Sequence, residues 1–224
     1  MKKKLRNPNT AKLWDHLLFE NNNELLKSPI YQDKINRILK YLKGQKGSFL
    51  DIGFGMANLE KKIVSHGLDI SIHGVDISPK TVVSIRKQIK GKFIVGNIFN
   101  LPFESAFFDV AVILDVIEHI EKDRIMAGFK EVKRVLKTGG NLVISVPLNE
   151  NLKQLNKEGK NYNAHLREYT LKVLMKELNK SGFKIFKHEY LYAFRKFYKP
   201  KSFIINLAPF LKNPNLLIAY SKKK

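Results

Sequence analysis

The chain contains no cysteine. This absence excludes disulfide bonds, thiolate metal sites and cysteine nucleophiles, and it is typical of a reducing compartment, so we expect a cytoplasmic protein. No apolar run approaches the roughly 20 residues of a membrane-spanning helix. The basic start Met1–Arg6 is followed by Asn7-Pro8-Asn9, where a secretion signal would have its apolar segment. The sequence therefore predicts neither a transmembrane segment nor a secretion signal.

Acidic residues are few: 20 Asp and Glu stand against 41 Lys and Arg, which gives a formal net charge of +21. Such an excess suits an anionic partner, such as nucleic acid, a phosphorylated small molecule or a membrane surface. A second explanation is compositional, because the lysines are spread along the chain and Lys, Asn and Ile are abundant throughout, as in proteins from AT-rich genomes. Both explanations stay open at this point.

The length of 224 residues, of which 44% are hydrophobic, fits one α/β domain and is short for two. Apolar residues at helical spacing predict two helices, at 11–26 and 30–42, and we interpret residues 1–46 as a helical cap on a domain that spans residues 47–224. From Ser48 the pattern alternates between strand and helix, which is typical of a parallel sheet. The predicted elements are strands at 48–52, 70–75, 92–95 and 108–114, with helices at 57–66 and from Ser78.

The second half continues the alternation. A helix at 122–136 is expected to stop at the turn Thr138-Gly139-Gly140, before a strand at 141–146. A polar loop at 148–163 leads to a helix that Thr170 caps and that reaches Gly182. Strands are predicted at 183–190 and 216–220, with a basic and aromatic insert at 191–214 between them.

A glycine turn follows the first predicted strand. Gly53 and Gly55 stand between a strand and a helix, where glycines let backbone N–H groups approach a ligand closely. Asp76 ends the next strand, where an acidic side chain can bind ribose hydroxyls. A dinucleotide and an adenosyl ligand both fit this pair. Asp51 before the turn favours the adenosyl ligand, because a carboxylate there would repel a pyrophosphate but can receive a cationic amino-acid group.

A series of ordered motifs between about residues 48 and 186 resembles the class I S-adenosylmethionine-dependent methyltransferases, of the type found in ubiquinone biosynthesis and among small-molecule and glycan-associated enzymes. The resemblance implies a Rossmann-like α/β fold, with a seven-stranded, mostly parallel sheet whose last strand is antiparallel and with helices on both faces. The motifs are Leu50-Asp51-Ile52-Gly53-Phe54-Gly55, Gly74-Val75-Asp76-Ile77-Ser78, Gly96-Asn97-Ile98, Phe108-Asp109-Val110, Val116-Ile117-Glu118-His119-Ile120 and Glu131 to Gly140.

The resemblance also implies S-adenosylmethionine as the methyl donor and S-adenosylhomocysteine as the product. By position, the glycine turn with Asp51 would hold the methionine end and Asp76 the ribose. Asn97 stands where the family usually has an aspartate that contacts the adenine, and an amide oxygen accepts the same hydrogen bond. The implied cofactor-binding residues are Asp51, Gly53, Gly55, Asp76, Ile77, Asn97, Ile98 and Asp115.

Asp115, Glu118 and His119 follow a predicted strand, and the carboxyl ends of such strands are where open α/β sheets bind ligands. His165 is expected near the same edge. We interpret His119 and His165 as candidate bases. An orienting role, or a mere helix cap, also fits the Glu118-His119 pair. The stretch from His165 to Thr170 resembles a segment that lines the acceptor side in glycan-associated methyltransferases, which makes Arg167 and Tyr169 predicted substrate-binding residues. Glu118, beside His119, is the third.

The same side chains permit an alternative with a metal. Asp115, Glu118, His119 and His165 offer two carboxylates and two imidazoles, which suit Mg²⁺, Mn²⁺ or Zn²⁺. A similar set occurs in methyltransferases that modify the 3′-terminal ribose of small RNAs. The primary prediction includes no metal.

The sequence thus predicts transfer of a methyl group to an oxygen or nitrogen atom of a small molecule, such as a sugar, a lipid-linked intermediate or a secondary metabolite. An anionic acceptor would suit the net charge. The alternative is a metal-dependent RNA ribose 2′-O-methyltransferase, and a third is a scaffold that has lost activity. The 191–214 insert is interpreted as a substrate lid or a core helix. The alternative is a peripheral membrane contact, because apolar residues beside lysines suit a membrane surface. Those apolar residues are Phe203, Ile204, Ile205, Leu207, Phe210 and Leu211.

Overall fold

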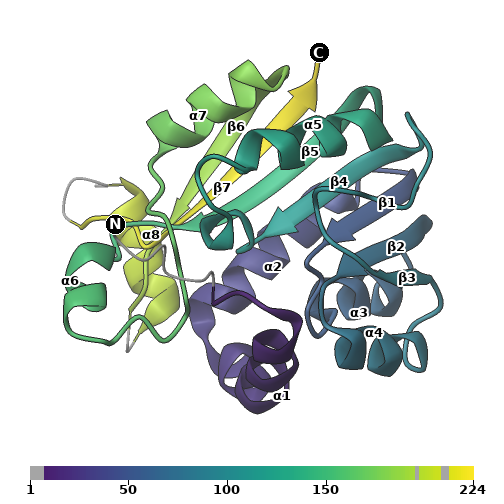
Figure 1. Cartoon of the computed structure of the whole chain (residues 1–224). Coiled ribbons are helices and arrows are strands. Elements are labelled where there is room, and N and C mark those ends of the chain that lie inside the picture. The colour runs from purple at the N-terminus through teal and green to yellow at the C-terminus, as the bar shows by residue number, and fades with distance from the viewer. Residues whose placement is uncertain (1–7, 195–196, 208–211) are drawn as a thin grey trace.

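The computed structural model describes residues 8–194, 197–207 and 212–224, and its centre is a single seven-stranded sheet (Figure 1). The strand order is β3-β2-β1-β4-β5-β7-β6. The first five strands pair in parallel and β7 runs antiparallel to both of its neighbours. The predicted fold class is confirmed. The strands are β1 (Gly47–Ile52), β2 (Ile70–Asp76), β3 (Lys92–Val95), β4 (Phe108–Leu114), β5 (Leu136–Pro147), β6 (Phe183–Leu191) and β7 (Leu216–Lys223).

Helices cover both faces of the sheet. Helices α5 (Ile125–Val135) and α7 (Leu171–Lys180) lie on one face, and α2 (Pro29–Leu42), α3 (Asn58–Ser65) and α4 (Pro79–Arg86) lie on the other (Figure 1). Helix α1 (Ala11–Lys27) crosses beyond α2, with Thr10 as its N-cap. Pro29 starts α2, where its missing N–H costs nothing. The apolar positions of α2 recur on one side and are buried, which fixes the helix against the sheet.

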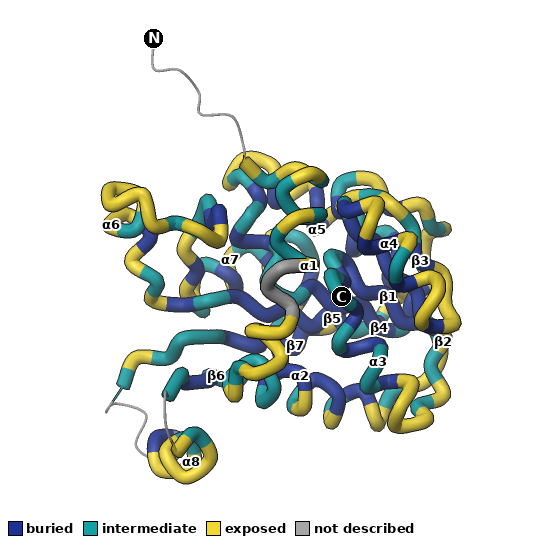
Figure 2. The backbone as a smooth tube through the Cα atoms, turned by 90° about the horizontal axis from the view of Figure 1, so that it is seen from below, coloured by how far each residue is buried: buried dark blue, intermediate teal, exposed yellow. Residues whose placement is uncertain are grey.

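The sheet separates two apolar clusters, visible as buried strand segments in Figure 2. One joins α5 and α7 to the sheet through side chains such as Phe129 and Leu178, and the other joins α2, α3 and α4 through side chains such as Ile38 and Ile63. Burial on both faces explains why the central strands read as nearly continuous apolar runs. The rigid centre holds the carboxyl ends of β1, β2 and β4 side by side.

Three details differ from the sequence-based expectation. Helix α5 begins at Ile125, three residues later than predicted, and ends at Val135. The Thr138-Gly139-Gly140 turn lies inside β5, where Gly139 has a φ of +73° and the pairing register with β4 shifts. The expected polar loop at 148–163 contains the short helix α6 (Leu152–Lys157). The glycine pair thus does not end a helix, because pairing with β4 makes it part of β5.

The 191–214 insert contains helix α8 (Tyr198–Leu207), which stands apart from the sheet in Figure 2. The hydroxyl of Tyr198 donates to Asp33 Oδ2 of α2 at 3.1 Å. Phe203, Ile204 and Leu207 are 56–73% exposed, whereas Ile205 is buried. Phe210 and Leu211 lie outside the described residues. No helix in the described ranges is long and apolar enough to cross a membrane.

Candidate functional site

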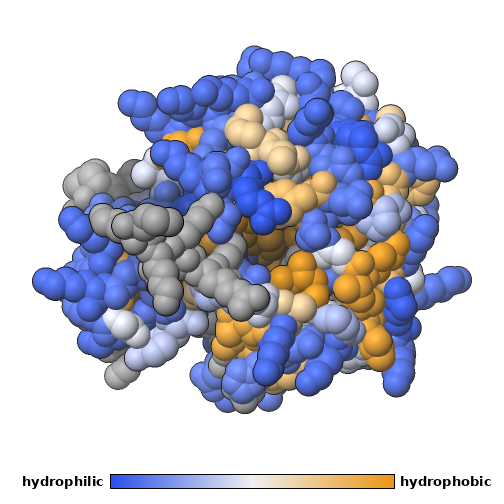
Figure 3. Space-filling model, in the orientation of Figure 1, coloured by the Kyte–Doolittle hydropathy of each residue, from blue (hydrophilic) through white to orange (hydrophobic). Residues whose placement is uncertain are grey.

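A cavity of about 1080 Å³ opens at the carboxyl ends of β1, β2 and β4, between the sheet edge and α1. In the orientation of Figure 1, Figure 3 shows a hollow near the centre of the visible face. Nearly all of the predicted site residues line this cavity. They are Asp51, Gly53, Gly55, Asp76, Ile77, Asn97, Ile98, Asp115, Glu118, His119 and His165.

The glycine turn after β1 depends on the absence of side chains. Gly53 has a φ of +82°, and a Cβ placed there would lie 2.4 Å from Cγ2 of Val116. Gly55 has a φ of +50°, and its N–H donates to Asp76 Oδ2 at 2.9 Å. Both glycines therefore adopt a left-handed conformation that other residues rarely take, and the turn keeps its backbone open to the cavity.

Asp76 joins the glycine turn to the end of β2. Its Oδ1 accepts a hydrogen bond from Ser78 N at 2.8 Å, and its Oδ2 accepts the one from Gly55 N. Burial raises the pKa of Asp76, while these backbone hydrogen bonds oppose the rise. Each carboxylate oxygen has a second lone pair, so a ligand hydroxyl can still donate to Asp76.

A pair of buried carboxyl groups, Asp51 and Glu60, lies on the wall of the cavity. Glu60 belongs to the first turn of α3, and the sequence interpretation missed it. Asp51 is 2% exposed and Glu60 0%. Asp51 Oδ1 and both Glu60 oxygens accept no hydrogen bond from any described donor. Burial raises the pKa of both. The charge of Glu60, and a hydrogen bond that the two carboxyl groups share once Asp51 is protonated, raise the pKa of Asp51 further. Such a pair is a suitable receptor for a cationic group.

Asp115 forms an ion pair with Lys34 of α2, a second residue that the sequence interpretation missed. Its Oδ1 also accepts a hydrogen bond from Ser145 Oγ at 2.6 Å. Burial alone would raise the pKa of Asp115, but the Lys34 ammonium and the Ser145 hydroxyl hold it below its usual value. Lys34 is only 2% exposed. This bridge ties α2 to the carboxyl end of β4 at the floor of the cavity.

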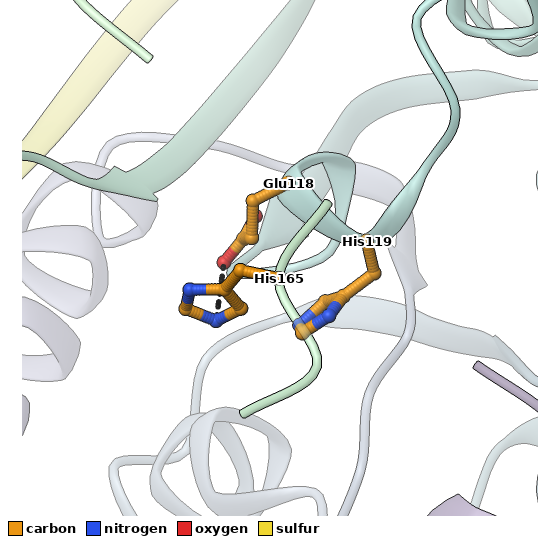
Figure 4. Close-up of side chains that lie close together, drawn as sticks. All are labelled: Glu118, His119 and His165. Carbon is orange, nitrogen blue, oxygen red and sulfur yellow. Dashed lines mark ion pairs between the residues drawn. The ribbon is translucent and has the colours of Figure 1, made fainter. Parts of the chain in front are cut away.

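Glu118, His119 and His165 also line the cavity, and their side chains lie close together (Figure 4). Glu118 and His119 belong to the short 3₁₀ helix η1 (Ile117–His119), and His165 comes from the segment between α6 and α7. Glu118 Oε1 lies 4.0 Å from His165 Nε2, and the two imidazole rings are 4.7 Å apart. A hydrogen bond of 2.9 Å from Leu166 N to Glu118 O fixes the two segments together.

The charge states of this cluster follow from its burial. Glu118 is 0% exposed, and burial together with the charge of Asp115 raises its pKa well above the usual value. Burial, and then the neighbouring His165, lower the pKa of His119 to about 4, so this imidazole is neutral at physiological pH. His165 Nδ1 lies 2.8 Å from Glu150 Oε2. Glu150 also lines the cavity and is a third residue that the sequence did not reveal.

Two predicted substrate-binding residues lie elsewhere. Arg167 forms an ion pair with Glu177 of α7, and its Nη1 donates to the Tyr169 hydroxyl at 2.8 Å. Tyr169 is 2% exposed and packs in the core beside α7. Neither residue is among those that line the cavity. They stabilise the segment that carries His165 instead of facing an acceptor, which corrects the sequence-based expectation.

The residues present fit S-adenosylmethionine. The buried carboxyl pair Asp51 and Glu60, in which Asp51 Oδ1 and both Glu60 oxygens accept from no described donor, matches the ammonium of its methionine end. The open glycine turn leaves room for that chain, and Asp76 stands where a ribose would reach it. Asn97 is exposed at the cavity, and its side-chain oxygen accepts a hydrogen bond from Phe99 N at 2.9 Å, which leaves a lone pair for an adenine amino group.

Comparison with known sequences agrees with this geometry. Residues 50–144 match the family model described as a methyltransferase domain. The chain is 29% identical over 153 residues to demethylmenaquinone methyltransferase of Thermotoga maritima, covering 61% of this chain and 65% of that protein. It is 26% identical over 118 residues to O-methyltransferase rstn1 of Aspergillus nomiae, covering 50% and 51%. The chain thus spans between about half and two thirds of these curated relatives.

Solved structures share the fold across nearly the whole chain. One is a methyltransferase of Thermotoga maritima described as a possible histamine N-methyltransferase, with a TM-score of 0.69, 21% identity and coverage of 96% of this chain and 99% of that one. Another is the 1,6-didemethyltoxoflavin-N1-methyltransferase of Burkholderia thailandensis, solved with its acceptor and S-adenosylhomocysteine, with a TM-score of 0.67, 17% identity and coverage of 96% and 87%. At these identities the likeness shows the Rossmann-like fold.

Proposed function

We propose that this chain is an S-adenosylmethionine-dependent methyltransferase that acts on an oxygen or nitrogen atom of a small molecule. The observation that carries the proposal is one cavity lined by two chemically distinct groups of residues. The glycine turn and the buried carboxyl pair Asp51 and Glu60 form the first group, and the cluster of Glu118, His119 and His165 forms the second. The matched methyltransferase domain covers the first group and η1.

S-adenosylmethionine supplies a methyl group already activated on a sulfonium, so the protein has to align the acceptor and accept its proton. The acceptor atom forms a bond to the methyl carbon as the carbon–sulfur bond breaks, and the bonding electrons stay on sulfur. The Asp51 and Glu60 carboxyl groups would hold the ammonium, Asp76 the ribose, and the cluster with the two histidines the acceptor.

His165 is better placed than His119 to take a proton directly. The carboxylate of Glu150 accepts from Nδ1–H of His165, which leaves the lone pair of Nε2 available inside the cavity. The low pKa of His119, about 4, makes that imidazole a weak proton acceptor. His119 packs edge-on against Trp14 of α1 with ring centroids 4.8 Å apart, which suits a wall that orients the acceptor.

A small-molecule acceptor agrees with the relatives, whose names refer to demethylmenaquinone, histamine and a toxoflavin precursor. None of these names favours the RNA alternative. The volume of about 1080 Å³ accommodates a cofactor and a small acceptor together. A radiolabelled methyl donor tests this choice: we expect label in the small-metabolite fraction of a cell extract, and label confined to the RNA fraction would refute it.

The exposed apolar side of α8 supports a second, accessory proposal, contact with an anionic membrane surface. Phe203, Ile204 and Leu207 are exposed next to Lys199 and Lys201, and the chain carries a net charge of +21. We expect the protein to co-sediment with vesicles that contain phosphatidylserine, and the variant Phe203→Ser/Ile204→Ser to lose this. Equal binding of both proteins, or no binding by the wild type, would exclude the contact.

A further inference from the structure

The most unusual chemical feature of the cavity is the Glu118 carboxyl group. It is 0% exposed, and neither of its oxygens has a hydrogen-bond partner among the described residues. A carboxylate removed from water without a partner is costly, and proteins compensate such groups with a cation or a donor. Lys34, whose charge also reaches Glu118, is already paired with Asp115. Glu118 therefore lacks a positively charged hydrogen-bond partner among the residues that the structure describes.

The neighbours of Glu118 are two nitrogen donors. Glu118, His119 and His165 each place one ligand atom so that all three lie within 4.8 Å of one another. Donors bound to one ion at about 2.1 Å lie roughly 3–3.5 Å apart, so closure around an ion requires the side chains to draw in by roughly an ångström. Figure 4 shows Glu118 pointing toward His165 with His119 beside them.

The surroundings of His165 are those of a metal ligand. Its Nδ1 is within hydrogen-bonding distance of Glu150 Oε2, at 2.8 Å, and the proton held there leaves the lone pair of Nε2 directed at Glu118. A carboxylate that binds the outer nitrogen of a histidine in this way orients the ring and strengthens it as a ligand. The Asn161 side chain also fixes the backbone of His165, with hydrogen bonds of 2.8 and 3.1 Å.

We propose that Glu118, His119 and His165 bind a divalent first-row transition-metal ion, such as Mn²⁺, Co²⁺ or Zn²⁺, whose remaining coordination positions face the cavity. Two imidazoles and one carboxylate are the ligands of such ions and leave positions open for oxygen donors. Asp115, which the sequence placed among the ligands, is excluded because Lys34 and Ser145 occupy its oxygens. Glu150 does not bind the ion but positions the His165 ring through its hydrogen bond with Nδ1.

The ion also narrows the chemical class of the methyl acceptor, and this step rests on the proposed function. The open positions of such an ion would suit an acceptor hydroxyl, so we expect a hydroxyl compound, for instance one with two adjacent oxygens. The lone pair of His165 that could take a proton would then bind the ion. The ion would instead lower the pKa of the acceptor hydroxyl, so that its proton passes to water in the cavity before the methyl group is transferred.

Metal binding is tested on the whole chain without any turnover. The protein is stripped with EDTA, dialysed and titrated calorimetrically with Mn²⁺, Co²⁺ and Zn²⁺, and Co²⁺ is also followed by its visible absorption. We expect a single ion per chain and a rise in the melting temperature. Glu118→Gln and His165→Gln should lose binding, whereas His188→Gln, a change at an exposed histidine of β6, should bind as the wild type does.

The variants of Glu150 separate positioning from folding. Glu150→Gln keeps an oxygen that accepts from His165 Nδ1 and should retain binding, whereas Glu150→Ala should weaken metal affinity by about tenfold or more. The proposal is overturned if the wild type binds none of the three ions, or if Glu118→Gln binds them equally well. Because binding of S-adenosylmethionine is measured separately, a failure here leaves the proposed function intact and can be distinguished from its failure.

Discussion

Removal of either partner of the Lys34–Asp115 ion pair is expected to destabilise the protein, and the two costs should differ. Side-chain exposure is 2% for Lys34 and 36% for Asp115. In Lys34→Met, the carboxylate keeps its hydrogen bond from Ser145 and reaches water in the cavity, so we expect a loss of about 1–2 kcal/mol. In Asp115→Asn, the ammonium stays buried without its partner.

The loss for Asp115→Asn should be about 3 kcal/mol, at the lower end of the range for a broken buried pair, because Asp51 and Glu118 also interact with Lys34. Asparagine tolerates the φ of +54° at position 115, so backbone strain adds little. The double variant should be more stable than Asp115→Asn alone, since it removes the unpaired charge.

Urea-induced unfolding followed by circular dichroism measures these differences. Lys137→Met is the matched control, because it breaks a more exposed pair with Asp109, with side-chain exposures of 46% and 32%, and should cost less than about 1 kcal/mol. The reasoning fails if Lys34→Met costs as much as Asp115→Asn, or if the double variant is the least stable of the three.

Three further predictions concern the turn, the carboxyl pair and acid stability. Glu60→Gln should weaken binding of S-adenosylmethionine about tenfold through loss of a charge partner, and Glu158→Gln, at an exposed site, should not; calorimetry decides. Gly53→Ala should unfold at a lower temperature than Gly159→Ala. Both glycines have a positive φ (+82° and +67°), but only at Gly53 would the added Cβ lie within 4 Å of another residue. Equal melting temperatures would contradict this. Burial would raise the pKa of Asp109, but Lys137 and Ser48 N hold that pKa below its value in the unfolded chain. The ionised carboxylate therefore stabilises the fold above about pH 4, and this stabilisation is lost as the pH falls further. The urea midpoint of Asp109→Asn should accordingly fall less between about pH 5 and 3 than that of the wild type.

The fold could be predicted because its signals are local and repeated. Alternating apolar runs gave strand β3 at 92–95 and strand β4 at 108–114 with their observed bounds, and Thr170 was identified as an N-cap that the structure confirms. The place of the Thr138-Gly139-Gly140 turn was wrong, because pairing with β4 begins already at Leu136. The predicted start of α5 was three residues too early, since the chain forms a turn before Ile125.

The site divides in the same way. Residues at strand ends, such as Asp51 and Asp76, were predictable because the topology brings the carboxyl ends of parallel strands to one edge. Glu60 and Lys34 depend on the burial of helix faces. A signal existed, since Glu60 stands three residues before Ile63 and Lys34 four before Ile38, each on the apolar side of its helix. Glu150 had no such signal, because its role depends on how the chain folds back from β5 to His165.

Calorimetric titration of the purified chain with S-adenosylmethionine tests the central claim most directly. The account predicts saturable binding to one site per chain, competition by S-adenosylhomocysteine, and severe weakening in Asp76→Ala, because that change removes both the expected ribose contact and the acceptor that holds Gly55 N. Weakening in Asp51→Asn without loss of the folded circular dichroism spectrum would separate ligand contact from turn geometry. A wild-type chain that is folded and shows no heat of binding with S-adenosylmethionine would contradict the account.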